Sequence, residues 1–135
     1  MNSIVLDTNI VLDLFVFGDV ACIPLGLALQ RGRLQWLATQ AMRDELEQVL
    51  AYPQICKSLA HHQVSVQQVL QRFDAMARLE LVPPKASVTC KDSDDQKFID
   101  LAVAHRAMLL SKDKAVLCMK KRLLPLGVLA QSALE

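Results

Sequence analysis

Short apolar runs alternate along this chain with longer segments of helical periodicity. The first run, residues 3–6, contains β-branched side chains and ends at a polar cluster, which predicts a buried strand. The runs at 34–38, 107–111 and 126–130 predict further short strands, and the run at 79–84 predicts one that stops at two prolines. Strands that alternate with helices favour an α/β fold with a mostly parallel sheet and right-handed crossovers.

Helical patterns fill the segments between the predicted strands. Residues 9–17 are apolar almost all round, which predicts a helix buried in the core or in a subunit interface. Ser65 with Gln68, and Ser93 with Gln96, match the capping box that opens many helices. The other predicted segments are a helix at 19–31, a helix at 39–50 with Thr39 as its N-cap, helices at 54–62, 65–78 and 93–106, and a loop and helix within 112–122.

Composition and charge narrow the class of protein. With 135 residues, 53% of them hydrophobic, the chain is expected to form one domain, residues 1–135, with a well-filled core. The formal net charge of +1 disfavours a strongly basic protein that coats nucleic acid. Four widely spaced cysteines without a CxxC pair indicate reduced, mostly core thiols in a cytoplasmic protein. Asp7, Asp13 and Asp19 interrupt the apolar runs, so neither a signal peptide nor a membrane span is expected.

Two acids follow predicted strands directly. Asp7 ends the first strand, and Asp113 lies two residues past the strand at 107–111. Ligands of parallel sheets bind at the carboxyl ends of the strands. The two carboxylates are therefore expected at one edge of the sheet if their strands are neighbours.

Helical geometry selects two further acids. In the helix at 39–50, Glu45 falls at the border of the apolar stripe, whereas Asp44 and Glu47 point away from it. In the helix that begins near 93, Asp95 projects on the side of the apolar face and Asp100 projects on the opposite side. Glu45 and Asp95 are thus the acids of these helices that lean inward.

Each acid also has a purely structural explanation. Asp95, like Asp94, lies in a first helical turn, where carboxylates interact favourably with the helix dipole. Glu45 fits a surface acid paired with a base, and Asp113 fits a turn former. Asp7 is harder to explain in this way, because an acid at the end of a buried strand needs a partner or a cation. Three other acids are expected to face solvent or to cap helices: Asp13, Asp19 and Asp74.

Four inward-leaning carboxylates without nearby histidine or cysteine ligands suit a hard divalent cation such as Mg²⁺ or Mn²⁺. Such clusters mainly serve phosphoryl chemistry, in which the ions bind the phosphate and lower the pKa of an attacking water. Without a cation, the carboxylates would repel each other and raise one another's pKa.

At this point the pattern resembles the PIN domain. The resemblance rests on VLDTN at the first strand end, Glu45, the segment CKDSDDQKFIDLAVAH and LLSKD, in this order and spacing over nearly the whole chain. The most similar branch is the VapC-like group of toxins from toxin–antitoxin pairs. The resemblance implies a three-layer α/β/α fold and a Mg²⁺- or Mn²⁺-dependent ribonuclease, commonly a homodimer and often inhibited by a cognate antitoxin protein.

The family's metal-site acids correspond to four residues of this chain: Asp7, Glu45, Asp95 and Asp113. Asp95 is preferred over Asp94 because of its spacing from the helix FIDLAVAH, and Asp92 and Asp94 match the acid-rich approach of this branch. Thr8 and Asn9 match the polar residues after the first acid, where Asn9 either orients a carboxylate or water or caps the helix. Many relatives carry a further acid where this chain has Ala115.

Basic and aromatic residues add candidates for contacts with RNA. Five basic residues cluster near Asp113 and either steer RNA phosphates or form a solvated helix face: Lys112, Lys114, Lys120, Lys121 and Arg122. Trp36 and Phe73 are expected in the core, not as platforms for bases. His105 is expected on a core-facing stripe, so catalysis by histidine is disfavoured.

Two other functions compete with a ribonuclease. A phosphatase with Asp7 as its nucleophile would usually carry a DxD motif, but the second position is Asn9. The alternative is a protein-interaction module that retains the fold with weak or no catalysis. Ala115 slightly favours the module, and four intact acids argue against it.

Overall fold

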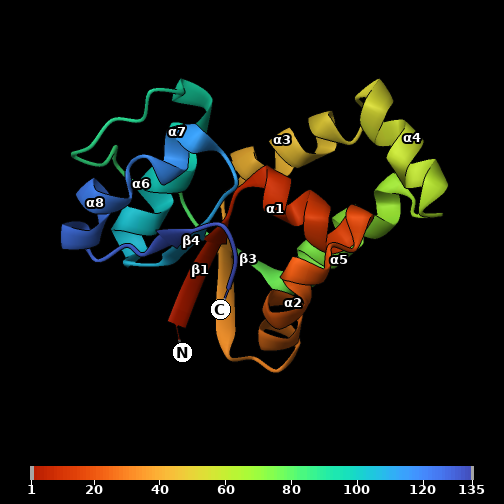
Figure 1. The fold of residues 1–135 in the computed structure, drawn as a ribbon, viewed down its shortest axis with the longest axis horizontal. Helices are drawn as coiled ribbons and strands as arrows, with labels where there is room; N and C mark the ends of the chain where they lie inside the picture. The colour runs from red at the N-terminus through yellow and green to blue at the C-terminus, as the bar shows by residue number, and fades with distance from the viewer. Residues whose placement is uncertain (1, 135) are drawn as a thin grey trace.

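Five parallel strands form one sheet in the computed structural model, which describes residues 2–134 (Figure 1). The order across the sheet is β3-β2-β1-β4-β5. The strands are β1 (Asn2–Leu6), β2 (Leu34–Ala38), β3 (Ala77–Leu79), β4 (Met108–Leu110) and β5 (Ala130–Gln131). Helices cover the sheet to give three α/β/α layers, which confirms the predicted fold class.

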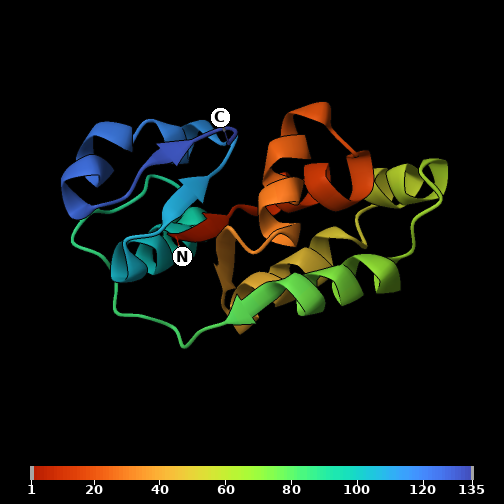
Figure 2. The same ribbon diagram turned by 90° about the horizontal axis from the view of Figure 1, so that it is seen from below.

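The helices fall into two groups along the sheet. Figures 1 and 2 show α1 to α5 gathered beyond β1, β2 and β3, and α6 to α8 beside β4 and β5. The α-helices are α1 (Thr8–Leu12), α2 (Ile23–Gln30), α3 (Gln40–Val49), α4 (Pro53–His61), α5 (Val66–Met76), α6 (Gln96–His105), α7 (Lys114–Leu117) and α8 (Lys120–Leu123). A π-helical segment η1 (Asp13–Phe17) continues α1, and the 3-10 segments are η2 (Val20–Cys22), η3 (Ser93–Asp95) and η4 (Leu124–Leu126).

Aromatic packing joins the sheet to the helices of the first group. Trp36 of β2 is 1% exposed, and its ring centroid lies 4.9 Å from that of Phe73 on α5 and 5.9 Å from that of Phe15 in η1. Phe73 is also buried. The prediction that Trp36 and Phe73 belong to the core is confirmed.

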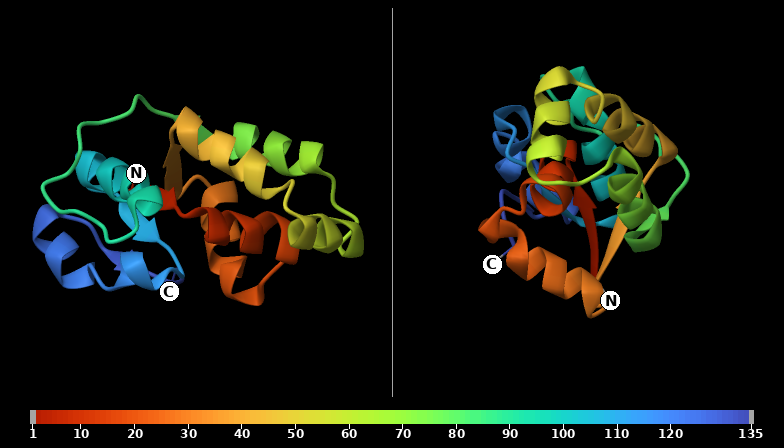
Figure 3. Two further views of the ribbon diagram at one scale, coloured as in Figure 1. Left: turned by 90° about the horizontal axis from the view of Figure 1, so that it is seen from above. Right: turned by 90° about the vertical axis from the view of Figure 1, so that its right-hand side faces the viewer.

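The third strand lies earlier in the chain than predicted. β3 pairs with β2 at residues 77–79, whereas Leu81 and Val82 have left the sheet and are exposed. Pro83 and Pro84 have no N–H to donate to a neighbouring strand, so pairing cannot continue through them. The chain then follows the outside of the molecule as an irregular segment to α6 (Figures 2 and 3).

One of the two predicted capping boxes is formed. The Ser65 hydroxyl accepts a hydrogen bond of 3.1 Å from the Gln68 N–H, and the Ser65 N–H donates one of 2.9 Å to the Gln68 side chain. At Ser93 the prediction is wrong. There the Asp92 carboxylate accepts the hydrogen bond from Asp94 N–H, which moves the cap one residue earlier.

Other details also differ from the sequence-based predictions. The last strand, β5, is shorter than the predicted run 126–130 and begins only at Ala130, because Gly127 turns the chain with φ 83°. His105 is exposed, since it is the final residue of α6. Thr39 precedes α3, but its side chain accepts no capping hydrogen bond.

The four cysteines are free. Cys22 and Cys90 are buried, as predicted, whereas Cys56 and Cys118 are exposed. Across residues 2–134, no single helix has the length and hydropathy needed to cross a membrane; the segments 8–17 and 20–30 meet those criteria only as a pair, bent by 107°.

Candidate metal centre

The pairing of β1 with β4 brings Asp7 and Asp113 to the same edge of the sheet. The Asp7 N–H continues the ladder by donating a hydrogen bond of 2.9 Å to the carbonyl of Leu110 at the end of β4. Between the two acids lies Ser111, which is fully buried. Its hydroxyl donates a hydrogen bond of 2.6 Å to the Asp7 carboxylate and accepts one of 3.0 Å from the Asp113 N–H.

The third acid, Asp95, comes from a different segment, directly before α6. It is the last residue of η3, is only 7% exposed, and precedes a helix that packs on β1 and β4. One carboxylate oxygen each from Asp7, Asp95 and Asp113 lie within 4.8 Å of one another. The structure therefore brings together three of the four acids predicted to form the site.

Burial and mutual repulsion disfavour the charged forms of these carboxylates. The pKa of Asp95 is raised to about 8, mainly because the carboxyl group is buried. The adjacent Asp113 carboxylate, which can accept a hydrogen bond from neutral Asp95, and the charge of Asp7 raise it further. Burial also raises the pKa of Asp7, against the hydrogen bond from Ser111, and the charge of Glu45 adds to the rise. The metal-free site thus favours carboxyl groups that keep a proton.

A divalent cation fits this arrangement. Oδ2 of Asp95 is buried without a hydrogen-bond partner among the described residues, which is costly unless something else binds it. The converging side-chain atoms are carboxylate oxygens, the ligands that Mg²⁺ and Mn²⁺ prefer. Asp7, Asp95 and Asp113 are the residues that would hold such an ion.

Glu45 lies beside the three acids but has other partners. Its side chain is half-buried while Asp44 and Glu47 are exposed, as helical geometry predicts. One carboxylate oxygen accepts a hydrogen bond from the Thr8 hydroxyl, and the other lies 2.7 Å from Nζ of Lys97. Glu45 is outside the group of three converging carboxylates, so its role as a fourth metal ligand stays a prediction.

The other polar residues predicted near the site, Asn9, Asp92 and Asp94, make different contacts. The Asn9 side chain accepts a hydrogen bond of 3.3 Å from the Lys112 N–H, which links α1 to the loop after β4. Asp92 caps η3. Asp94 is exposed, and its carbonyl accepts a hydrogen bond from Lys97.

The basic residues near Asp113 do not form one uniform group. Nζ of Lys112 lies 2.5 Å from a carboxylate oxygen of Asp13, which is only 6% exposed. The expectation that Asp13 faces solvent or caps a helix is therefore wrong, because Asp13 is buried in an ion pair with Lys112, which is distant in the sequence. The remaining members are exposed on or near α7 and α8: Lys114, Lys120, Lys121 and Arg122.

Sequence reasoning missed three residues of this region. Ser111 directly follows β4, and the same strand-end rule that selected Asp7 would have selected it. Lys97 follows Asp95 by two positions, but nothing in the sequence pairs it with Glu45, 52 positions earlier. Tyr52, placed at a helix boundary before Pro53, lines a hollow next to Glu45.

The family profile described as the PIN domain matches residues 3–115 of the chain, a range that includes Asp7, Asp95 and Asp113. No curated protein matches the chain.

Proposed function

Because the chain belongs to the PIN domain family, we propose that it is a divalent-metal-dependent ribonuclease that hydrolyses phosphodiester bonds of RNA. PIN domains are generally nucleases that use divalent metal ions. The observation that carries the proposal is the convergence of Asp7, Asp95 and Asp113 within 4.8 Å. These carboxylates would hold Mg²⁺ or Mn²⁺, which would supply positive charge to the phosphate and lower the pKa of a water.

The side chains of this site have separate roles. Asp7, Asp95 and Asp113 would hold the cation, and one of these carboxylates would also accept the proton of the attacking water. Ser111 fixes the orientation of the Asp7 carboxylate through its hydrogen bond. Glu45, held by Thr8 and Lys97, adds negative charge at the border of the site and is the candidate for a fourth ligand.

RNA phosphates would approach over the exposed basic residues of α7 and α8. Lys114 is the first residue of α7, and Lys120, Lys121 and Arg122 lie on α8. Such side chains attract phosphates without reading sequence. Lys112 contributes less to this surface, since it is paired with Asp13.

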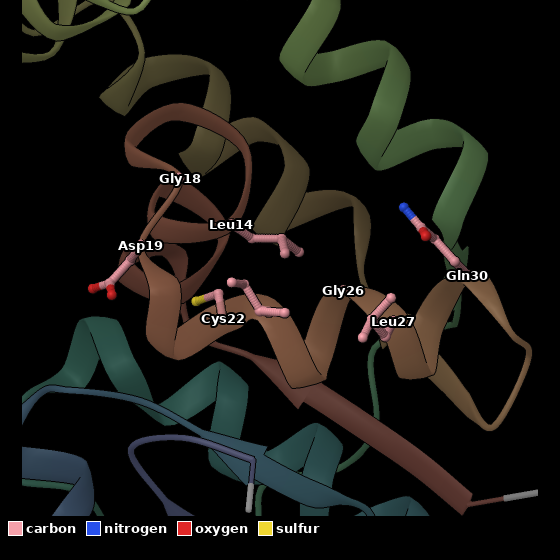
Figure 4. Close-up of a pocket in the computed structure, with 8 residues that line it drawn as sticks. Leu14, Gly18, Asp19, Cys22, Gly26, Leu27 and Gln30 are labelled. Atoms are coloured by element: carbon pink, nitrogen blue, oxygen red, sulfur yellow. The ribbon is translucent and has the colours of Figure 1, made fainter.

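We also propose that the protein acts in the cytoplasm as the toxin of a toxin–antitoxin pair and forms a homodimer. Exposed apolar side chains support a protein partner: Val20, Ile23 and Leu27 are 76%, 56% and 42% exposed. Beside them lies a hollow of about 240 Å³ between η1 and α2, lined in part by Leu14, Cys22 and Leu27 (Figure 4). Exposed apolar surface of this kind is typical of interaction sites.

The same surface favours the second candidate function, an interaction module without catalysis. In that case the exposed apolar side chains of η2 and α2 would carry the function, and the three acids would be a remnant of the fold. Ala115, in the first turn of α7 directly after Asp113, supplies no further carboxylate to the site.

One assay separates the two candidates. The protein is incubated with single-stranded and structured RNA in Mg²⁺, in Mn²⁺ and in EDTA, together with Asp7→Asn and Asp95→Asn. Cleavage that requires the metal and both carboxylates supports the ribonuclease. Cleavage that survives EDTA or either variant contradicts the metal mechanism, and absence of both cleavage and Mn²⁺ binding by calorimetry favours the interaction module.

A further inference from the structure

A polar hollow of about 400 Å³ is lined by Glu45, at the border of the metal site, and by none of the three converging acids. One face of α3 forms its wall, and Tyr52, Asp94 and Lys97 complete it. Its volume falls in the range of small-molecule and nucleotide sites. Glu45 is common to both regions, because it lines the hollow and is hydrogen-bonded to Thr8, the neighbour of Asp7.

Among residues 2–134, Tyr52 is the only Phe, Trp or Tyr side chain that is exposed. The chain has six aromatic residues, and the rings of Phe15, Trp36, Phe73 and Phe98 are buried in the core. The Tyr52 side chain is 49% exposed and lines the hollow. An aromatic ring exposed on the wall of a hollow offers a flat face on which a nucleobase can stack.

The backbone holds Tyr52 firmly although its ring is exposed. Its N–H donates a hydrogen bond of 3.0 Å to Val49, and its carbonyl accepts hydrogen bonds of 2.9 and 2.8 Å from Ile55 and Cys56. Pro53, which follows it, keeps Tyr52 in the extended conformation at the start of α4. The ring is thus presented from a fixed position, which lowers the entropy lost when a base stacks on it.

Lys97 supplies a cation at the end of the hollow nearest the acids. Its ammonium group donates to the Glu45 carboxylate at 2.7 Å and to the Asp94 carbonyl, and it lies 4.9 Å from the centre of the Phe98 ring. An ammonium group has three N–H donors, so one remains for a ligand. Lys97 is half-buried and is already paired with Glu45, and Asp44 and Asp94 also line the hollow, so what it offers a phosphate is this remaining N–H and not a free positive charge.

We propose that this hollow binds one nucleotide of the RNA next to the bond that is cut, with its base stacked on Tyr52 and a phosphate bonded to Lys97. The proposal rests on the ribonuclease function proposed above. Glu45 separates the nucleotide from the three acids by one side chain, so the neighbouring phosphodiester lies against the metal site. The polar face of α3 then lies along the edge of the base, with Asp44 and Gln48 as its hydrogen-bonding groups.

The test measures binding of short fluorescent single-stranded RNAs by anisotropy, with Ca²⁺ in place of Mn²⁺ to slow cleavage. Each RNA carries one abasic ribose, moved along the strand from one RNA to the next. We expect Tyr52→Ala to weaken binding of the intact RNA about tenfold, since stacking on one aromatic ring has about that effect. Tyr52→Phe keeps the ring and is expected to bind as the wild type does.

The abasic RNAs identify the stacked base. At one position the abasic ribose weakens binding by the wild type about tenfold but weakens binding by Tyr52→Ala no further. Lys97→Met lowers the slope of log affinity against log salt concentration by about 0.7, and Lys97→Arg restores it. Leu81→Ala, at a side chain 91% exposed and outside the hollow, is the matched control with unchanged binding.

Failure of this proposal is distinct from failure of the ribonuclease function. Metal-dependent cleavage by the wild type together with unchanged RNA binding by Tyr52→Ala overturns the nucleotide site alone, as expected if a protein partner occupies the hollow. Equal losses for wild type and Tyr52→Ala at every abasic position also overturn it. A wild type that neither binds nor cleaves RNA overturns both proposals.

Discussion

The hydroxyl of Ser111 donates a hydrogen bond of 2.6 Å to the carboxylate of Asp7, which lies 104 positions earlier in the chain. Both residues directly follow parallel strands that are neighbours in the sheet, and both are buried. The hydrogen bond stabilises the charged form of Asp7 against the burial that raises its pKa. Ser111 therefore prepares Asp7 to act as a metal ligand.

Removal of the Ser111 hydroxyl is expected to weaken metal binding. In Ser111→Ala the pKa of Asp7 rises further, and the Mn²⁺ dissociation constant measured by calorimetry at neutral pH increases about tenfold. Ser58→Ala is a matched control, because the Ser58 hydroxyl bonds only to the Gln54 carbonyl within α4. Equal Mn²⁺ affinity in the two variants would refute the role of Ser111.

The affinity for Mn²⁺ is expected to rise with pH. Asp95, with a pKa of about 8 in the metal-free protein, carries a proton at neutral pH that must leave before a cation binds. The affinity therefore increases by up to about tenfold for each pH unit below 8 and levels off above it. Calorimetry in buffers of different ionisation enthalpy is expected to show release of about one proton at pH 7. An affinity independent of pH over this range contradicts the assignment.

The stability of the metal-free protein has the opposite dependence on pH. The pKa of Asp95 is higher in the folded chain, about 8, than the value of 3.8 expected when unfolded, so the folded state binds the extra proton. This contribution is complete below about pH 4 and is lost as the pH rises through 8. In EDTA at pH 9, Asp95→Asn is expected to be more stable than the wild type by about 1–2 kcal/mol, seen as a higher melting temperature. At pH 5 the difference is expected to shrink, and a constant difference argues against a buried titrating carboxyl.

Calorimetry of two variants decides the role of Glu45. Because its carboxylate is already bonded to Thr8 and Lys97, Glu45→Gln is expected to weaken Mn²⁺ binding less than the loss of a converging carboxylate does. Asp113→Asn removes one of the three converging carboxylates and is expected to weaken it by at least about tenfold. A loss in Glu45→Gln as large as that in Asp113→Asn would make Glu45 the fourth ligand that the sequence predicts.

Stability of the fold is expected to depend on the packing of Trp36 far more than on ion pairs at the surface. Trp36→Ala leaves a cavity against Phe15 and Phe73 and is expected to cost about 3–5 kcal/mol in urea unfolding. Arg43 and Asp74 form a two-pronged ion pair between α3 and α5, but Asp74 is half exposed. Arg43→Ala is therefore expected to cost less than about 1 kcal/mol. Similar losses in both variants would contradict this ranking.

Helix faces and strand ends could be predicted from the sequence because they depend on local periodicity. Glu45 was separated from Asp44 and Glu47, and Asp95 from Asp100, by the direction in which each side chain projects. The prediction failed where hydrogen bonds with distant groups compete with local ones. Gln96 does not complete a capping box with Ser93, since its side chain accepts a hydrogen bond of 2.6 Å from the Cys90 N–H.

The sequence by itself determined that Asp7 and Asp113 follow strands and that Asp95 leans inward at the start of a helix. Only the tertiary structure decided that these acids meet, because the order of strands in a sheet depends on long-range packing that no local pattern encodes. The pairing of Lys112 with Asp13 could not be predicted for the same reason, because it too depends on long-range packing. Each of these contacts joins segments distant in sequence, which only the folded sheet brings into reach.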